Sequence, residues 1–246
     1  MNRPLIIAVD GPSGAGKSTL GRLLARSLGL LYLDTGAMYR AVALAVMRAG
    51  VSLADHGRIA EVARRADIQL EGDPDSLQVR LDGADVSAEI RGEQAGHAAS
   101  VVSAIPEVRR ELVRRQREMG ASGGVVLDGR DIGTVVFPDA DVKFFLTADP
   151  AERARRRFDE DRLKSRAQTY EETLADLTAR DRRDESRADS PLKKADDAVV
   201  VDTTGRTIDE VFRHMLGVVR ERHGAGDGAG DGDGRVGSRD AGEGAG

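Results

Sequence analysis

Near its N-terminus the chain reads Leu5-Ile6-Ile7-Ala8-Val9-Asp10-Gly11-Pro12-Ser13-Gly14-Ala15-Gly16-Lys17-Ser18. Its last eight residues match the pattern Gly-x-x-x-x-Gly-Lys-Ser/Thr, in which backbone N–H groups surround phosphate oxygens. In such a loop the lysine reaches the outer phosphates and the hydroxyl holds Mg²⁺. The stretch therefore predicts a nucleoside triphosphate site that uses Lys17 and Ser18.

The residues on either side of this loop agree with the motif. The apolar run before it predicts a buried strand, and leucines at positions 20, 23, 24 and 28 have helical spacing up to Gly29. A phosphate-binding loop needs this strand-loop-helix context. An ordinary glycine-rich surface turn is therefore the weaker interpretation.

Length and composition favour one intracellular domain. The chain has 246 residues, of which 40% are hydrophobic, enough to fill one large core. It contains no cysteine, so disulfides and thiolate metal sites are excluded and a reducing cytoplasm fits. No apolar run approaches the roughly 18 residues of a membrane span, and we find no signal-peptide pattern. We expect a soluble cytoplasmic protein without a membrane partner.

Although the net charge is −5, two segments, 153–166 and 180–187, are rich in arginine, and each also contains acidic residues. Such runs are usually solvated helical faces. A phosphoryl-transfer enzyme, however, needs several guanidinium groups to neutralise two sets of phosphates. Both interpretations stand at this point.

Strand and helix patterns alternate along most of the chain. This alternation predicts an α/β fold with a five-stranded parallel sheet and helices on both faces, and with ligands at the carboxyl ends of the strands. The expected strands are 5–9, 30–33, 125–127, 142–146 and 198–202. The expected helices are 19–28, 37–48, 53–66, 106–119, one from about 150, 170–184, and a last one that opens with a capping box at Thr207.

Two segments depart from this alternation. Residues 68–87 show period-2 alternation and an Asp-Gly turn, which predicts a small antiparallel meander as a candidate specificity element. Residues 224–246 are rich in glycine and aspartate without apolar periodicity, so we expect a disordered tail after a domain spanning 1–223.

Acids stand at the ends of four expected strands: Asp10, Asp34, Asp128 and Asp202. For Asp34 and Asp202, a helix cap or turn is as good an explanation as a binding role. Asp128 closes an apolar strand in the arrangement that orients Mg²⁺ or its waters. We therefore expect Asp128 and Ser18 to share the metal.

The class of phosphate-loop protein can be narrowed. A GTPase switch would be expected to carry an Asn-Lys-x-Asp guanine motif, but the only asparagine is Asn2. A motor or transporter would need a larger chain or a signature segment. A small kinase should carry a second anion site built from arginines and closed by a mobile lid.

Four segments in register resemble the bacterial cytidylate kinases, which belong to the nucleoside monophosphate kinases. They are 10–18, Leu33-Asp34-Thr35-Gly36-Ala37-Met38-Tyr39-Arg40, 128–138 and Arg180-Asp181-Arg182-Arg183-Asp184-Glu185-Ser186-Arg187. The resemblance runs over residues 3–222 and includes the meander. It implies a P-loop kinase fold, a monophosphate-binding insert over about 67–105, a lid over about 150–168, and transfer of a phosphoryl group from ATP to CMP or dCMP with Mg²⁺.

The resemblance also implies roles for individual residues. ATP would lie on Gly11, Pro12, Ser13, Gly14, Ala15, Gly16, Lys17, Ser18 and Thr19. The acceptor nucleotide would meet Thr35, Arg40, Ser100, Arg109, Arg130, Asp131, Arg180, Asp184 and Arg187. Lys17, Arg130 and Arg180 would be catalytic, and the lid would carry Arg153, Arg156 and Arg157.

Within the acceptor site the implied roles divide by substrate group. Ser100 and Arg109 would read the base with Asp131, since an arginine and a carboxylate together match the acceptors and amino donor of cytosine. Arg130 would bind the acceptor phosphate, Arg180 would bridge phosphates, and Asp184 would hold the ribose. Arg187 would lie near the base.

Two alternatives remain open. A related kinase would act on UMP, AMP or another small metabolite, and a nucleotide-dependent binding switch would use the arginine helices to hold a partner. Aromatic residues make up 3% of the chain and tryptophan is absent, so stacking platforms for nucleic acid are scarce and no nucleic-acid partner is expected. We expect a monomer whose partners are small nucleotides.

Overall fold

The computed structural model describes residues 4–163 and 168–227 of the chain. Its centre is a five-stranded sheet in the order β2-β6-β1-β7-β8. The strands are β1 (Ile6–Asp10), β2 (Leu31–Asp34), β6 (Val125–Gly129), β7 (Val142–Thr147) and β8 (Val199–Asp202), and every neighbouring pair is parallel. The predicted parallel sheet is confirmed, and all its carboxyl ends share one edge.

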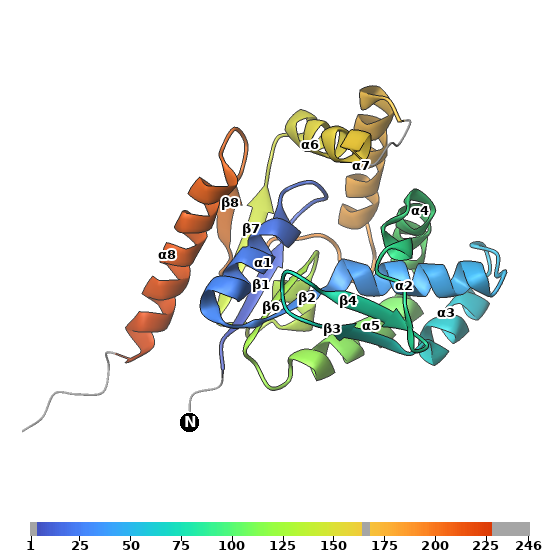
Figure 1. The fold of residues 1–246 in the computed structure, drawn as a ribbon, viewed down its shortest axis with the longest axis horizontal. Helices are drawn as coiled ribbons and strands as arrows, with labels where there is room; N and C mark the ends of the chain where they lie inside the picture. Colours follow the sequence, from blue (N-terminus) through green and yellow to red (C-terminus); the bar gives the residue numbers. More distant parts are fainter. Residues whose placement is uncertain (1–3, 164–167, 228–246) are drawn as a thin grey trace, which may run out of the picture.

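Helices cover both faces of this sheet (Figure 1). Alternate residues of β1 face opposite ways: Ile7 and Val9 pack in a core with α1 (Lys17–Leu28) and α8 (Ile208–Asp227), while Ile6 and Ala8 pack against α5 (Pro106–Gly120) and a π-helical turn, η2 (Ile132–Val136). A strand buried on both faces needs apolar residues throughout, which explains the uninterrupted apolar run in the sequence.

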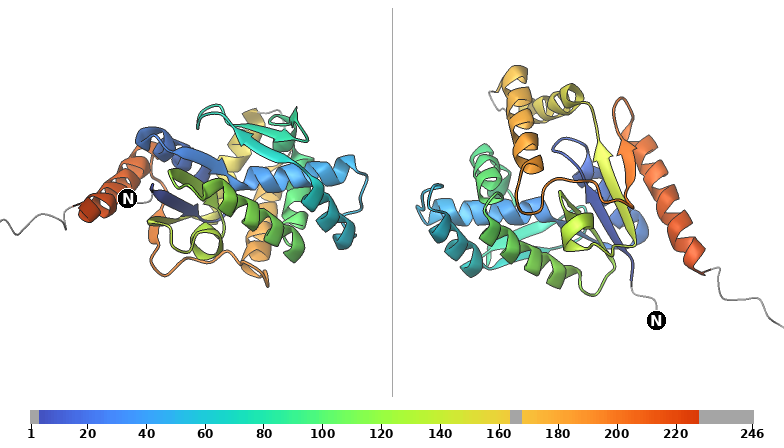
Figure 2. Two further views of the ribbon diagram at one scale, coloured as in Figure 1. Left: turned by 90° about the horizontal axis from the view of Figure 1, so that it is seen from below. Right: turned by 180° about the vertical axis from the view of Figure 1, so that it is seen from behind.

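A second core lies beside the sheet. The antiparallel strands β3 (Ile68–Glu71), β4 (Gln78–Leu81) and β5 (Ala84–Asp85) form the predicted meander. They pack with α2 (Thr35–Arg48), α3 (His56–Arg65), the 3₁₀ turn η1 (Glu89–Arg91) and α4 (Glu93–Val102) around one apolar cluster. Figure 2 shows this layer of the molecule from two further sides. The sequence interpretation did not anticipate α4.

The lid region comprises α6 (Pro150–Leu163), which packs against α7 (Tyr170–Glu185) above the carboxyl edge of the sheet (Figure 1). The predicted lid, about 150–168, therefore begins with α6, and its residues 164–167 lie outside the described residues.

Several predicted helix ends were wrong by a few residues. The helix expected from Leu53 begins at His56, because Asp55 caps it by accepting a hydrogen bond from the Arg58 N–H. The helices expected from Thr19 and Ala37 begin two residues earlier, at Lys17 and Thr35. The capping box at Thr207 is confirmed by its reciprocal bonds with Glu210.

The end of the chain also differs from the expectation. Helix α8 continues to Asp227, so the predicted boundary at residue 223 falls within a helix. The rest of the predicted tail, 228–246, lies outside the described residues. Within the described ranges, no helix has both the length and the apolar character needed to cross a membrane.

Candidate active site

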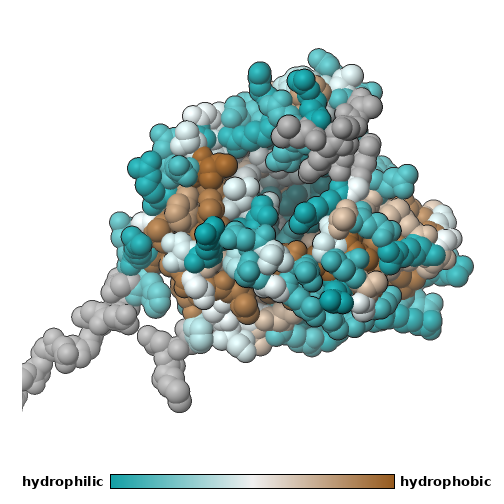
Figure 3. Space-filling model, in the orientation of Figure 1, coloured by the Kyte–Doolittle hydropathy of each residue, from teal (hydrophilic) through white to brown (hydrophobic). Residues whose placement is uncertain are grey.

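A cavity of about 790 Å³ lies at the carboxyl edge of the sheet, where the phosphate loop, α2, the β6–η2 turn, α6 and α7 meet. Figure 3 shows its opening as a hollow among hydrophilic side chains. This is the place where the ends of parallel strands put ligand-binding residues.

The phosphate loop follows β1 as a tight turn over residues 11–16. Gly11, Gly14 and Gly16 all have positive φ angles, of 144°, 78° and 89°. A Cβ at Gly11 would stand 2.1 Å from the Leu146 carbonyl oxygen, so no side chain fits there. The glycines of the motif are therefore required by this backbone path, and the loop opens directly into the first turn of α1.

Lys17 lies at the base of the cavity and is 7% exposed. Its Nζ donates to the Pro12 carbonyl oxygen across 2.7 Å. Burial and the nearby charge of Arg130 lower the pKa of Lys17 to about 7. An anion in the cavity would favour the charged ammonium, so this lysine is suited to bind phosphate.

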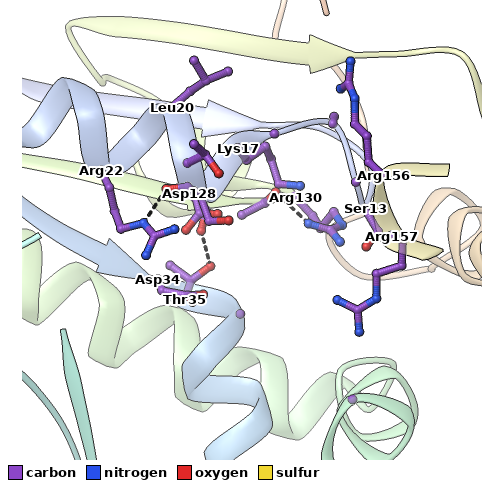
Figure 4. A pocket seen from close by; sticks show the side chains of 18 of the residues that line it. Ser13, Lys17, Leu20, Arg22, Asp34, Thr35, Asp128, Arg130, Arg156 and Arg157 are labelled. Carbon is purple, nitrogen blue, oxygen red and sulfur yellow. Dashed lines mark hydrogen bonds between the residues drawn. The ribbon is translucent and has the colours of Figure 1, made fainter. Parts of the chain in front are cut away.

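Two carboxylates face the loop from β2 and β6. The Asp128 carboxylate accepts a 2.9 Å hydrogen bond from Tyr32, and burial together with the charge of Asp34 raises its pKa to about 6. Burial also acts to raise the pKa of Asp34, but Arg40 and the Ala37 N–H outweigh it, and the pKa is lowered. Figure 4 shows Asp34, Thr35 and Asp128 close together beside Lys17.

For Asp34 the expected helix cap is confirmed, and the side chain also forms an ion pair. One oxygen caps α2 by accepting from the Ala37 N–H, and the other pairs with Arg40 across 2.9 Å. Asp202 is an exposed turn former that accepts from the Thr204 N–H and hydroxyl. The hydroxyl of Thr35 donates to the Asp128 carbonyl oxygen across 2.7 Å, which joins the start of α2 to the end of β6.

Arginines approach the cavity from the opposite side. Arg130 follows β6 and pairs with Asp184 of α7 at 2.9 Å. Arg180 lies one helical turn before Asp184, and among the described residues its guanidinium has no hydrogen bond or ion pair. Burial and the charge of Arg130 lower the pKa of Arg180 to about 10. Arg180 is therefore a buried cation that lies beside another cation and has no carboxylate partner of its own among the described residues.

A buried polar network forms the far wall. Arg109 of α5 donates to Asp131 across 2.5 Å and to the Ser103 carbonyl oxygen across 3.2 Å. Its guanidinium also lies 5.5 Å from the centre of the Tyr39 ring. Arg187 donates to the Ser103 hydroxyl and to Asp184. This wall therefore contributes an arginine, a carboxylate and a tyrosine to the lining of the cavity.

The lid arginines have three different environments. Arg153 is 5% exposed and bonded to Ala148, Ser13 and Asp181. Arg156 donates to the Thr203 carbonyl oxygen, and Arg157 pairs with Asp161. In Figure 4, Arg156 and Arg157 leave α6 in opposite directions. Arg156 and Arg157 line the cavity, whereas Arg153 does not.

The structure brings most of the predicted site residues to one cavity. Its lining includes residues 13–19, Thr35, Arg40, Arg109, Asp128, Arg130, Asp131, Arg156, Arg157, Arg180, Asp184 and Arg187. Gly11, Pro12, Ser100 and Arg153 do not line it. The Ser100 hydroxyl is buried and has no hydrogen-bond partner among the described residues.

Sequence reasoning missed several lining residues, among them Tyr32, Tyr39 and Ser103, and left a binding role for the lining residue Asp34 open. A signal for Tyr39 existed, since it lies four residues after Thr35 and hence on the same face of α2. Ser103 follows the end of α4, and only the fold brings it to Arg187, which is 84 positions away in the chain. Asp10 was named only as an acid at the end of the first expected strand, without a role. Its carboxylate accepts from the Ile132 and Gly133 N–H groups and so holds the start of η2.

Comparisons with known proteins agree with one another. The family model described as cytidylate kinase matches residues 7–221. A cytidylate kinase of Geobacter sp. (strain M21) is 52% identical over 91% of this chain and 96% of its own. One from Citrifermentans bemidjiense is 51% identical over the same shares of the two chains, 91% and 96%. A solved gluconokinase from Sinorhizobium meliloti, 14% identical, has a similar fold at a TM-score of 0.50 and covers 93% of this chain and 99% of its own.

Proposed function

The chain belongs to the cytidylate kinase family and is a nucleoside monophosphate kinase, and we propose that it transfers the terminal phosphoryl group of ATP to CMP or dCMP through the residues of the described cavity. The products would be ADP and CDP or dCDP. Residues 11–19 would hold ATP, with backbone N–H groups of the loop and the N-terminus of α1 directed at its phosphates.

One observation supports this proposal above the others. Lys17, Arg130 and Arg180 come from three separate elements and lie near enough that Arg130 lowers the pKa of each of the other two. Converging cations destabilise one another unless an anion is present. Two sets of phosphates, one from the donor and one from the acceptor, would supply the missing negative charge.

The acceptor would enter from the wall opposite the loop. Arg130 would bind its phosphate, Arg180 would bridge the two phosphate groups, and Arg40 would join them after leaving Asp34. Asp184 is 1% exposed and burial alone would raise its pKa, but Arg130 and Arg187 outweigh burial and lower it. It therefore stays ionised and would accept a hydrogen bond from a ribose hydroxyl.

The base would lie against the network of Arg109, Asp131 and Tyr39, with Ser100 and Arg187 nearby. Cytosine presents acceptor atoms beside an amino donor, and the Arg109 guanidinium and Asp131 carboxylate offer the complementary donors and acceptor. The pair is buried but belongs to the lining of the cavity, which supports this role.

No covalent intermediate is needed for this reaction, because the acceptor phosphate oxygen is already an anion. Catalysis would require the protein to hold the two nucleotides in line and to neutralise the negative charge that develops on the leaving group. Lys17, Arg130 and Arg180 would do this in the centre, and lid arginines such as Arg157 would add to it from α6.

Magnesium fits the side of the cavity next to Ser18. Burial and, after it, the charge of Asp34 raise the pKa of Asp128, and a divalent cation would offset both effects. The described residues contain no group of three or more metal-ligating side chains. This suits an ion held by Ser18, Asp128 and nucleotide phosphates, which when bound would neutralise phosphate charge.

We further propose that the enzyme is a cytoplasmic monomer. One chain supplies the loop, insert, lid and α7 residues that the proposed reaction uses, so this reaction requires no second subunit. A cytoplasmic location would supply the ATP that the reaction consumes.

The proposal is tested by following ADP formation from ATP with CMP, dCMP, UMP and AMP in turn. We expect CMP and dCMP to give the highest kcat/KM, with formation of the diphosphate. A preference for UMP or AMP would assign the chain another substrate. If ATP hydrolysis is slow and no monophosphate accelerates it, the result would favour a nucleotide-dependent binding switch over a kinase.

A further inference from the structure

Arg153 connects the lid to the phosphate loop instead of facing the cavity. Its Nε donates to the Ala148 carbonyl oxygen and one terminal nitrogen donates to the Ser13 carbonyl oxygen, both across 3.1 Å. A Cβ placed on Gly14 would lie only 3.0 Å from the Arg153 Cβ, so α6 rests directly on the loop. The first turn of α6 is thereby tied to the backbone that holds the donor phosphates.

The same guanidinium is also bound to α7. Its distance to the Asp181 carboxylate is 2.6 Å, and the two side chains are 7% and 12% exposed. Asp181 follows Arg180 directly and precedes Asp184 by one helical turn. One side chain thus joins the loop of the donor site to the helix that carries acceptor-site residues.

This arrangement requires arginine. The planar guanidinium carries donors that point in fixed directions, so it can reach the loop carbonyl, the Ala148 carbonyl and the carboxylate together. A lysine ammonium keeps the charge, but it is a single compact donor group and cannot span the same partners. A lysine at position 153 would therefore weaken the bonds to the phosphate loop and to Asp181 even though it preserves the charge.

We infer that Arg153 and Asp181 are positioning residues that set α7, and with it Arg180 and Asp184, at the correct distance from the phosphate loop. This inference rests on the proposed function, because it concerns the alignment of the two bound nucleotides. Neither residue needs to touch substrate. Misplacement of reacting groups by about 1 Å lowers a rate on the order of 100-fold, so the pair should act chiefly on kcat.

The test compares Arg153→Lys and Asp181→Asn with the wild-type chain. We expect kcat to fall by about 10- to 100-fold in each variant, while binding of ATP alone and of CMP alone changes by less than about twofold. Each single-nucleotide site keeps its own contacts: Lys17 and the loop N–H groups for ATP, and Arg130 with Asp184 for CMP. Arg155→Lys is the matched control, since Arg155 is exposed on the same helix and should leave kcat unchanged.

A double variant shows whether the two residues act as one unit. If they do, Arg153→Lys with Asp181→Asn is no slower than the slower single variant, because the link is already broken. If kcat of the double variant falls by the product of the two single losses, the inference is overturned. A kcat within twofold of wild type in both single variants would also overturn it.

A purely structural role gives a different pattern. It would weaken both nucleotide affinities and lower kcat only in step with the folded fraction measured by circular dichroism, and that result would also overturn the inference. If wild type itself fails to phosphorylate CMP, the proposed function fails instead, so the two failures are distinguishable.

Discussion

Arg109 and Asp131 form a buried ion pair, with 2.5 Å between the guanidinium nitrogen and the carboxylate oxygen and side chains that are 3% and 7% exposed. The pair joins α5 to the turn after β6, and Tyr39 covers the guanidinium from α2. Breaking such a pair at one end costs about 3–5 kcal/mol, because the remaining charge stays buried. The wall that we assign to the base therefore also stabilises the fold.

We predict that Asp131→Asn reduces the preference for CMP over UMP. The variant loses a charged acceptor for the cytosine amino group, which UMP lacks, and such a hydrogen bond is worth about 1.5–3 kcal/mol. We expect kcat/KM for CMP to fall at least about tenfold while that for UMP falls less. Steady-state rates below the melting temperature measure this, with Asp196→Asn on the exposed turn before β8 as the control. Equal losses for both nucleotides would exclude a base-reading role.

We predict that Lys17→Ala lowers kcat by about 100- to 1000-fold without unfolding the protein. Burial and the charge of Arg130 already disfavour its ammonium, and among the described residues its side chain donates a hydrogen bond only to Pro12. Removing the side chain therefore costs little stability, and thermal unfolding should show an unchanged or higher melting temperature. Near-normal turnover in this variant would contradict the assignment of Lys17 as catalytic.

ATP binding should take up protons through Lys17. Without bound nucleotide the pKa of Lys17 is lowered to about 7, and the phosphates of ATP would raise it again. At pH 8, binding of ATP should therefore be accompanied by uptake of close to one proton. Affinity for ATP should fall as the pH rises above 7. Calorimetry of Mg²⁺-free ATP in buffers of different ionisation enthalpy measures the uptake. Lys17→Ala should lack this proton, and an identical uptake in both proteins would contradict the prediction.

Local sequence signals predicted the sheet and part of the site because those features depend on neighbours in the chain. The phosphate loop is contiguous, and Arg180 and Asp184, which the resemblance implied, are four residues apart and therefore share a face of α7. Arg187 follows the end of that helix. The capping box at Thr207 is likewise complete within four residues. Such patterns can be interpreted without knowledge of the tertiary fold.

Other features depend on contacts between distant segments. Arg153 belongs to an arginine run and was expected in the lid, but its burial follows from Ser13 and Asp181, which lie 140 and 28 positions away. Helix α4 has no strong periodicity to mark it, since alanine and glycine fill much of Glu93–Val102. Tertiary packing, rather than propensity, decides such segments.

We predict that Gly11→Ala destabilises the protein more than Gly29→Ala does. Gly29 has a φ of 65° with open space around it, so alanine there costs only the left-handed backbone, about 1–2 kcal/mol. At Gly11 the φ is 144° and a new Cβ would stand 2.1 Å from the Leu146 carbonyl oxygen, so β7 or the loop must also shift. The free energies of unfolding in urea should therefore differ, with Gly11→Ala the less stable. Equal free energies for the two variants would show that the start of the phosphate loop yields more easily than its contact with β7 implies.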